Sequence, residues 1–489
     1  MRIISPQTKG GAVLLLALVS CSSRPDPPDA PSYDCRIPDE PSSIFGDITL
    51  HQSEEIPTVF ELTWSPVLSG SSQVQLDVGD GELLTFPTTS TTDGGLLSLL
   101  AGLKPSTTYE AQIILEAEDE TFCSDPLDIE TGTLPTYLPA FEFEELQPDQ
   151  AAGGFTLIPL LQSAPPTYQI ILDRDGEVVW YSEYDAIRMR LSIDGQAILI
   201  NDRITDPDRK GSILRLPLNG SEPSIIEVLG IHLDFVEVEH GRYASFGWDI
   251  RKVEGREHAM AGETIVEFTE DGEVHEVWNI FDYFDPSLIE GDNQIPLNCC
   301  PDIMMWAHLN HLHYAPEEDA YYVSSRLLMA IFKIDRSSGE LIWVLPNFSS
   351  QIESSFALME GSSSVSFTPH SAVPTKNGVL IFDTASQLTN DCSAISEFEL
   401  DEFNWEINHL GVYTTEDCQV SSMMGNAEAL WNDNRLLILS LNGQIDEVTE
   451  EGELVARWRA PQGTWLGFTT RVEALHSDSS THPMNTDAR

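Results

Sequence analysis

Short segments in which apolar and polar residues alternate recur along most of the chain, and clusters of Gly, Ser, Thr, Asp and Asn separate them. Residues 60–64 (FELTW) and 73–78 (QVQLDV) are clear examples, and the second is followed by Gly-Asp-Gly at 79–81. Alternation with a period of two is typical of a strand that buries one face, and the separating residues favour tight turns. The sequence therefore predicts an all-β fold.

Residues 42–135 are predicted to form a small antiparallel β-sandwich, because their alternating runs are short and closely spaced. Residues 103–109 (LKPSTTY) resemble the L-x-P-x-T-x-Y corner of fibronectin type III domains, in which the tyrosine hydroxyl fastens a strand to the preceding loop. Trp64 and the exit sequence ETGTLP at 130–135 are also similar to that family. The resemblance implies a spacer or adhesion module without catalytic chemistry of its own.

Residues 139–476 repeat a hairpin in which an acidic or polar residue precedes glycine and an apolar strand follows. The instances are DRDGEVVW at 173–180, LNG at 218–220, EDGEV at 270–274, DRSSGELIW at 335–343, DEFNW at 401–405 and EEGEL at 450–454. Such turns join adjacent antiparallel strands, and a spacing of roughly 45 to 65 residues suits one four-stranded blade each. We expect a six-bladed β-propeller, with the tryptophans that end these hairpins in the core; two unrelated sandwiches are the alternative.

Residues 1–21 have the order of features of a lipoprotein signal peptide. Arg2 and Lys9 precede an apolar run at 12–19, and Leu-Val-Ser leads to Cys21. The run is shorter than the ~20 residues that span a bilayer, so we expect a lipid anchor on Cys21. Ser22 is not an acidic retention signal, which favours a cell-envelope location at the outer membrane. A Pro-rich tether at 22–41 and a disordered tail at 477–489 complete the predicted organisation.

The chain is strongly acidic, with 79 Asp and Glu against 25 Lys and Arg and a formal net charge of −54. A surface of this sign repels nucleic acid and anionic lipid, so neither is an expected partner. Solubility accounts for such a charge, and calcium binding is the alternative. No loop of the D-x-[DN]-x-[DN]-G form is present to support calcium.

Six of the seven cysteines remain once the lipidated residue is set aside, an even number that fits an oxidising compartment. The expected disulfides are Cys35 with Cys123 and Cys392 with Cys418. For Cys299 and Cys300, which are adjacent, a vicinal disulfide and two unpaired thiols both remain open. No short-spaced pairs of zinc ligands occur, so no metal site is predicted.

Histidine is scarce, with 12 in the chain, yet three histidines lie within residues 306–314 (WAHLNHLHY). In a strand, alternation would place His308 and Asn310 on one face and His311 and His313 on the other. One face would look into the propeller channel while the other packs between blades. We expect His311 and His313 to be structural, with an H-x-H metal site as the alternative.

This region resembles the arylsulfotransferase family, propeller enzymes that move sulfate between phenolic esters and phenols without a nucleotide donor. Trp306, His308 and Asn310 match the family's W-x-H-x-N motif. Its serine-serine-arginine strand and the hairpin that follows are similar to residues 324–326 and 334–343. Its H-x-x-x-x-P-x-G-x-x-x-x-F-D stretch is similar to residues 370–383.

The resemblance implies a role for each matching residue. A sulfuryl group in transfer passes through a loose transition state whose charge lies on nonbridging oxygens, so fixed donors and cations must surround it. His308, Asn310 and Arg326 would line the sulfate pocket, Trp306 and Ser325 would contact the substrate, and His370 would assist proton transfer at the phenolic oxygen. A neutral imidazole can also accept the sulfuryl group covalently.

Two family positions are not matched. Thr-Ala-Ser at 384–386 stands where the family has an arginine after its F-D motif, and MMGNAE at 423–428 stands where it has its sulfate-accepting histidine. His409 and His476 align with no motif. The leading hypothesis is a lipid-anchored arylsulfotransferase-like enzyme that uses aryl sulfates and phenols and needs no cofactor. A catalytically inactive propeller that binds a ligand or surface partner is the alternative.

Overall fold

The computed structural model describes residues 35–476 apart from 80–81, 93, 118–119, 162–166, 203–205, 290–292, 363–364, 387–388 and 390. The expected signal peptide, Cys21, most of the tether and the tail lie outside these residues. Within them, strands alternate with turns, and helix is confined to α1 (Ser42–Phe45) and to 3-10 turns such as η1 (Ile280–Asp282), η2 (Pro286–Leu288) and η5 (Ser440–Asn442). The all-β prediction is confirmed. No helix of the described part has the length and apolar character of a membrane span.

Residues 49–130 form two facing sheets, which we call the two-sheet unit. One sheet has the order β1 (Thr49–Gln52), β2 (Phe60–Trp64), β6 (Leu96–Leu100), β5 (Thr89–Ser90). The other has the order β4 (Glu82–Pro87), β3 (Ser71–Gly79), β7 (Thr108–Ala117), β8 (Glu120–Cys123), and β9 (Leu127–Glu130) also pairs with β7. Phe60, Leu62 and Trp64 alternate into the buried layer between the sheets, as their period-two pattern requires.

Tyr109 links β7 to the loop before it. Its ring lies in the core of the two-sheet unit, and its hydroxyl accepts a hydrogen bond of 2.8 Å from the backbone N–H of Lys104. The chain joins this unit already at Cys35, which forms a disulfide with Cys123, ahead of the boundary expected at residue 42.

Tyr109→Phe is expected to lower the free energy of unfolding by about 1 kcal/mol, because the ring stays buried while the Lys104 N–H loses its acceptor. Urea unfolding of the full chain, followed by tryptophan fluorescence, measures the change. Tyr184→Phe, at an exposed tyrosine, is the control and should leave the midpoint unaltered. An equal midpoint for Tyr109→Phe would show that the hydroxyl does not stabilise the corner.

Residues 142–472 form six further sheets. The first three are β13 (Val178–Ser182)–β12 (Tyr168–Leu172)–β11 (Phe155–Leu161) with β37 (Trp465–Leu466) and β38 (Thr470–Val472); β14 (Met189–Leu191)–β15 (Ala197–Asn201)–β16 (Lys210–Pro217)–β17 (Ser224–Leu229); and β18 (His232–Glu239)–β19 (Arg242–Arg251)–β20 (Ala259–Thr269) with β21 (Val274–Asn279), β23 (Ile303–Met305) and β22 (Ile295–Pro296). The others are β24 (Leu309–Ala315)–β25 (Ala320–Ser325)–β26 (Ala330–Asp335)–β27 (Leu341–Pro346); β29 (Pro369–Thr375)–β30 (Gly378–Ser386)–β31 (Cys392–Asp401)–β32 (Glu406–Thr414)–β28 (Ala357–Leu358); and β33 (Asn426–Ala429)–β34 (Arg435–Leu439)–β35 (Gln444–Val448)–β36 (Leu454–Arg459)–β10 (Glu142–Glu145).

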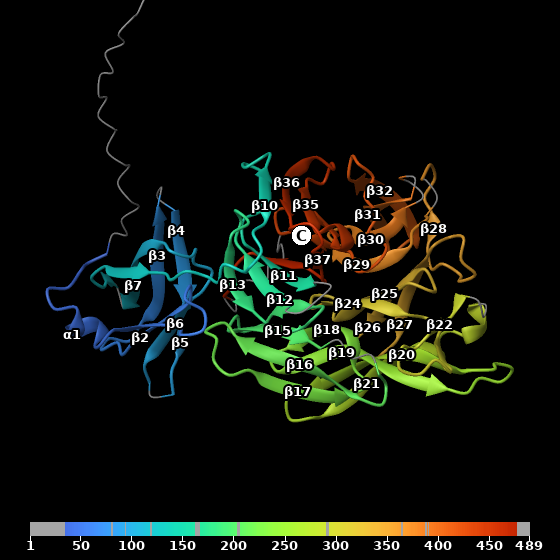
Figure 1. Cartoon of the computed structure of the whole chain (residues 1–489), viewed down its shortest axis with the longest axis horizontal. Helices are drawn as coiled ribbons and strands as arrows, with labels where there is room; N and C mark the ends of the chain where they lie inside the picture. The colour runs from blue at the N-terminus through green and yellow to red at the C-terminus, as the bar shows by residue number, and fades with distance from the viewer. Residues whose placement is uncertain are drawn as a thin grey trace, which may run out of the picture.

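The six sheets follow one another in chain order around a common centre, and the red strands return beside the cyan and green ones (Figure 1). Most first strands of successive sheets touch, since β11 contacts β14, β18 contacts β24, β24 contacts β29, and β29 contacts β33. Between the second and third sheets it is β15, the second strand of its sheet, that contacts β18. The two ends of this region share sheets, because β10 pairs with β36 while β37 and β38 pair with β11.

Of the hairpin tryptophans, Trp180 and Trp343 are buried as expected. Trp405 is 42% exposed, and the core prediction is wrong for this residue. It lies in the turn before β32 with φ of 57°, so it does not take part in strand alternation.

The two-sheet unit packs directly on the six-sheet region. Thr58 Oγ1 donates to Val179 O at 2.6 Å, and Lys104 Nζ lies 3.4 Å from the carboxylate of Asp173. Ile56, Val59 and Ala101 join a hydrophobic cluster formed mostly by the six-sheet region. These polar and apolar contacts fix the two units in one orientation.

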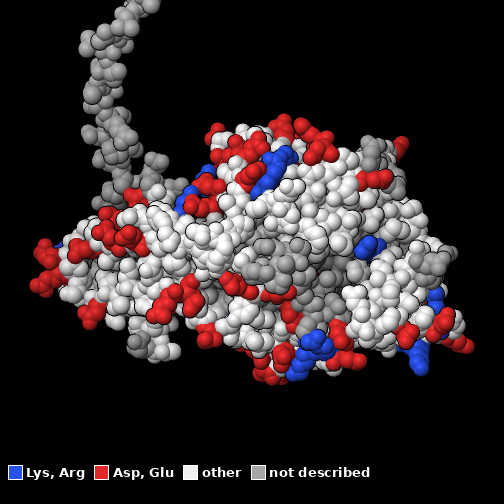
Figure 2. Space-filling view, viewed as in Figure 1, with Lys and Arg blue, Asp and Glu red and all other residues white. Residues whose placement is uncertain are grey.

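Acidic side chains are spread over the visible face of both units, and few basic ones stand among them (Figure 2). This face therefore has the negative charge that the composition predicts.

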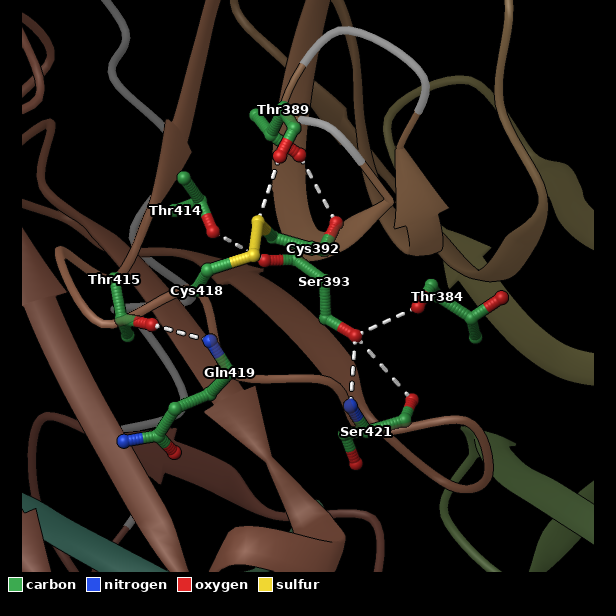
Figure 3. The surroundings of a disulfide bond; sticks show 9 residues. All are labelled: Thr384, Thr389, Cys392, Ser393, Thr414, Thr415, Cys418, Gln419 and Ser421. Carbon is green, nitrogen blue, oxygen red and sulfur yellow. Dashed lines mark hydrogen bonds between the residues drawn. A yellow bond between two sulfur atoms is a disulfide. The ribbon is translucent and has the colours of Figure 1, made fainter.

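The second expected disulfide, Cys392–Cys418, is present at the edge of β31 (Figure 3). Next to it, Ser393 Oγ donates to Thr384 O at 2.7 Å and accepts from Ser421 N at 2.8 Å (Figure 3). The disulfide and these hydrogen bonds hold the segment after β32 against β31, and this segment leads to residues 423–428.

Candidate functional site

Three histidines lie at the starts of neighbouring first strands. His232 begins β18, His308 immediately precedes β24, and His370 is the second residue of β29. Because β24 contacts both β18 and β29, the three imidazoles come together, and His308 lowers the pKa of both His232 and His370. Arg326 follows β25, and its backbone N–H donates to His308 O at 3.0 Å. The predicted residues His308, His370 and Arg326 are therefore brought together, and His232 joins them.

His308 is partly exposed and lies outside the strand in which alternation would place it. Its φ of 52° and a register shift between Leu309 and His311 turn it away from the β24 pattern. The carboxyl of Glu263 supports this turn, since its Oε1 accepts from Leu309 N at 3.2 Å. Burial raises the pKa of Glu263 to about 8. Among the described residues, the His308 ring has no hydrogen-bond partner, so neither of its nitrogens is occupied by the protein there.

Arg326 is exposed, and among residues 35–476 as described its guanidinium makes no hydrogen bond or ion pair. A guanidinium presents five donors in a planar fork that suits tetrahedral oxyanions. Its position beside His308 places an available cation next to an available imidazole in a chain of strongly negative net charge.

His370 is held from both sides by backbone. Its Nε2 accepts from Met424 N at 3.1 Å, so Nδ1 carries the proton and donates to Gly425 O at 3.0 Å. Residues 423–428, which lack the family's histidine, therefore orient a different histidine. Gly425 fits because a Cβ there would lie 2.0 Å from the ring of Phe382.

His232 was missed by sequence reasoning, since it falls outside the motif-bearing stretch. It stacks on Trp248 with 3.8 Å between ring centroids, and its Nδ1 lies 3.2 Å from Gly230 O. A carbonyl can only accept, so Nδ1 is protonated and Nε2 has a lone pair. In the described part of the chain this buried Nε2 has no partner.

All three imidazoles are neutral at pH 7. Burial, first among the causes, lowers the pKa of His308 to about 4 and the pKa values of His232 and His370 to about 3; Arg326 adds to the effect at His308 and His370. A neutral imidazole has one nitrogen lone pair, which makes it a nucleophile or a proton acceptor.

The other predicted substrate contacts point into protein. Trp306 is fully buried in a hydrophobic cluster 5.3 Å from the Phe281 ring. Asn310 Oδ1 accepts from Ser324 at 2.6 Å, and Ser325 Oγ donates to Ala307 O at 2.7 Å. These side chains hold the turn around His308 and do not themselves face an open site.

A second charged cluster lies deeper. Asp234, fully buried, accepts from Arg188 Nε at 2.8 Å, and Arg188 Nη2 lies 3.3 Å from His311 Nε2. The Phe468 ring separates this cluster from the histidine site, since it stacks on His370 at 5.5 Å while the Arg188 guanidinium lies 5.0 Å from it. This arrangement fits the structural role expected of His311.

Next to the charged cluster is a cavity of about 760 Å³, since Arg190, which lies 3.6 Å from Asp234, forms part of its lining. Arg190, Tyr314 and Trp431 line it from the six-sheet region, and Pro87 lines it from the two-sheet unit. The cavity and the histidine site therefore use different stretches of the first strands.

Two further histidines lie outside the site. His409, on β32, contacts the Phe398 ring, and His476 contacts Phe86 of the two-sheet unit, so neither joins the site.

The chain was compared with protein-family models and with curated proteins. The family model of Arylsulfotransferase (ASST) matches residues 142–473, from the first residue of β10 to just past β38. The search of the curated proteins found no match.

Solved structures give weak likenesses. A putative 6-phosphogluconolactonase from Bacteroides fragilis is 10% identical with a TM-score of 0.32, over 83% of this chain and 100% of that chain. Dihydro-heme d1 dehydrogenase NirN is 13% identical with a TM-score of 0.34, over 68% and 67%, and Saccharomyces cerevisiae Sqt1 is 11% identical with a TM-score of 0.30, over 76% and 94%. At these TM-scores none of them supports a statement about fold or activity. The family match spans more than half of the chain, so the protein belongs to the arylsulfotransferase (ASST) family and is an arylsulfotransferase-like enzyme.

Proposed function

We propose that the six sheets of residues 142–472 are the blades of a six-bladed β-propeller and that the two-sheet unit is a fibronectin type III-like domain. Contacts between successive first strands support the propeller, as does the sharing of sheets between the two ends of the region, which is how a ring of blades closes. The Tyr109 corner supports the second assignment.

We propose that the enzyme transfers sulfate from an aryl sulfate ester to a phenol without a nucleotide donor. One observation carries the proposal: the guanidinium of Arg326 lies beside the neutral imidazole of His308, and neither group has a hydrogen-bond partner within the part of the chain that the structure describes. The guanidinium binds the nonbridging oxygens of the sulfate and stabilises the negative charge that they carry in the transition state. The imidazole supplies a lone pair next to the sulfur.

Transfer takes two steps. A ring nitrogen forms a bond to sulfur as the bond from sulfur to the donor's phenolic oxygen breaks, and the donor leaves as a phenolate. The acceptor phenol then attacks sulfur, the N–S bond breaks, and the phenol's proton passes to a neutral imidazole. Splitting one displacement into two in this way is the usual benefit of covalent catalysis.

His308 and His370, the two histidines that the sequence predicted for the site, are the first candidates for the sulfuryl acceptor. His308 can act without breaking a hydrogen bond, whereas His370 must first release the Met424 N–H from Nε2. Mass spectrometry of the enzyme incubated with donor alone distinguishes them. Added sulfuryl mass on the peptide with His308 identifies that residue, and mass on the peptide with His370 shows that residues 423–425 move during the reaction.

Purified enzyme incubated with 4-nitrophenyl sulfate and a phenol tests the function. Release of 4-nitrophenol that depends on the acceptor, together with formation of the acceptor's sulfate ester, is the expected result. Release by hydrolysis alone would make the enzyme a sulfatase. Binding without turnover across a panel of donors and acceptors would leave the inactive propeller.

Arg326→Ala is expected to lower kcat by about 10²–10³-fold, the usual cost of removing one donor to developing negative charge. The fold should persist, because the described structure gives this guanidinium no partner to lose. Lys376→Ala, in the turn between β29 and β30, removes a cation away from the site and is the control. An equal loss of kcat in both variants would indicate that any positive charge acts at long range through the electrostatic field of the protein. That result would contradict a direct role of Arg326.

The low pKa of His308 predicts the pH profile. Its neutral form carries the lone pair, and it is protonated only near pH 4 in the folded enzyme, so kcat should stay level as the pH falls from 7 to 5 and decline below that range. An unperturbed imidazole would lose activity around pH ~6.5. Stopped assays between pH 3.5 and 8, corrected for unfolding, give the profile. A fall in kcat centred near pH ~6.5 would show that His308 is not the group that must be neutral.

We propose that the enzyme is anchored in the cell envelope by lipid on Cys21. The order of charge, apolar run and Leu-Val-Ser-Cys at the N-terminus supports this. Cys21→Ala should shift the protein from the membrane fraction to the soluble fraction, and retention in the membrane would contradict the anchor.

A further inference from the structure

Two thiols remain free in a chain whose other described cysteines are all in disulfides. Cys299 and Cys300 lie in the turn between β22 and β23, and neither is bonded to the other. This turn is tight, since Cys300 N donates to Leu297 O at 3.1 Å and Ile303 N donates to Cys300 O at 2.9 Å. The two thiols play no part in the sulfate site.

A carboxylate from a distant part of the sequence faces the two thiols. Asp206 lies in the connection between β15 and β16, and one of its oxygens and the two sulfurs all lie within 4.8 Å of one another. Asp206 Oδ1 accepts from Asp208 N at 3.0 Å, which fixes the direction of the carboxylate. Two loops of different sheets thus present three ligand atoms to one point.

The donor set selects a class of cation. Thiolates are soft ligands that disfavour Mg²⁺ and Ca²⁺, whereas two sulfurs and one carboxylate oxygen suit a borderline divalent ion that takes four tetrahedral ligands. Cys299 is exposed, so an ion can enter and water can complete the coordination. The net charge of −54 raises the local concentration of cations.

We propose that Cys299, Cys300 and Asp206 bind one divalent ion of the zinc type, with water as the fourth ligand. Each thiol releases its proton on binding, and the ion neutralises negative groups that otherwise repel one another. The bound ion ties the β15–β16 connection to the turn that leads through β23 to Trp306 and His308. Its role is thus to hold two loops of the fold together, apart from the transfer reaction.

Cobalt is the probe, because thiolate-bound Co²⁺ absorbs in the near ultraviolet and tetrahedral Co²⁺ absorbs in the visible. The protein used is the full chain with Cys21→Ser, stripped with chelator and given only a mild reductant that leaves both disulfides intact, so that Cys299 and Cys300 are its only thiols. Both absorption bands are expected to rise together, to saturate at one Co²⁺ per chain, and to disappear when Zn²⁺ is added.

Variants assign the ligands. Cys300→Ser should remove the near-ultraviolet band or weaken Co²⁺ binding at least 10-fold, and Asp206→Asn should weaken binding by a similar factor. Asp302→Asn, two residues from Cys300 but outside the cluster, is the matched control and should bind as the parent does. Absence of both bands in the reduced parent would overturn the proposal. Unchanged binding by Asp206→Asn would overturn the three-ligand site, and rapid closure of a Cys299–Cys300 disulfide that Co²⁺ does not prevent would also count against it.

Discussion

His308→Ala is expected to lower kcat for sulfate transfer by about 10²–10⁴-fold, the range typical of losing a nucleophile or a proton-transfer group. His308 is the imidazole of the site without a hydrogen-bond partner among the described residues, and it lies next to the Arg326 guanidinium. Removing the ring takes away a lone pair without exposing a buried partner. Rates with 4-nitrophenyl sulfate and phenol at saturating concentrations measure the effect.

The control is His275→Ala, at an exposed position on β21, which lies on the other side of β19 and β20 from β18 and its His232. It should retain full activity. His308→Ala should also keep the parent's urea midpoint within experimental error, because the residue is only partly buried. Activity within a factor of about two of the parent would remove His308 from the mechanism and leave His370 and His232 as the candidate imidazoles.

Asp234→Ala is expected to lower the free energy of unfolding by about 3–5 kcal/mol, the largest effect on stability that we predict. The carboxylate is fully buried and accepts from Arg188 Nε at 2.8 Å and from Leu312 N at 2.9 Å. Without it, Arg188 is a buried cation whose Nη1 already has no partner among the described residues. Urea unfolding at pH 7 measures the loss.

Asp249→Ala is the matched control, since Asp249 pairs with Arg251 at 2.6 Å near the surface and should cost under about 1 kcal/mol. The double variant Arg188→Met/Asp234→Leu removes both charges and should recover part of the lost stability, because an apolar pair of similar size needs no compensation. A small loss for Asp234→Ala would show that water reaches Arg188.

The site illustrates how local geometry departs from simple patterns. Strand alternation predicted that His308 and Asn310 share one face. A left-handed φ at His308 and a register shift after Leu309 break the alternation, so the imidazole faces the site while the amide binds Ser324 and Pro369. Neither feature has a pattern in the sequence, because the conformation depends on support from Glu263 on another sheet.

The role of residues 423–428 also required the structure. By the resemblance, this segment stands where the family has its sulfate-accepting histidine, and it contains no histidine. In the fold its backbone holds His370 through Met424 N and Gly425 O, an interaction between residues about 54 positions apart that involves no side chain of the segment. Backbone contacts of this kind do not require a particular residue type, so the sequence does not reveal them. Gly425 is the exception, because Phe382 leaves no room for a Cβ there.

The sequence by itself determined the all-β fold, the two disulfides and the family, and it named His308, Arg326 and His370 as candidate site residues, because turn residues, alternation and contiguous motifs are local properties of the chain. Only the tertiary structure decided that His232 joins them, that Trp306, Asn310 and Ser325 support the site from within, and that Asp206 meets Cys299 and Cys300. Each of these contacts joins sheets that are far apart in the sequence. Such sheets come to lie side by side only when the whole chain folds and buries its apolar residues.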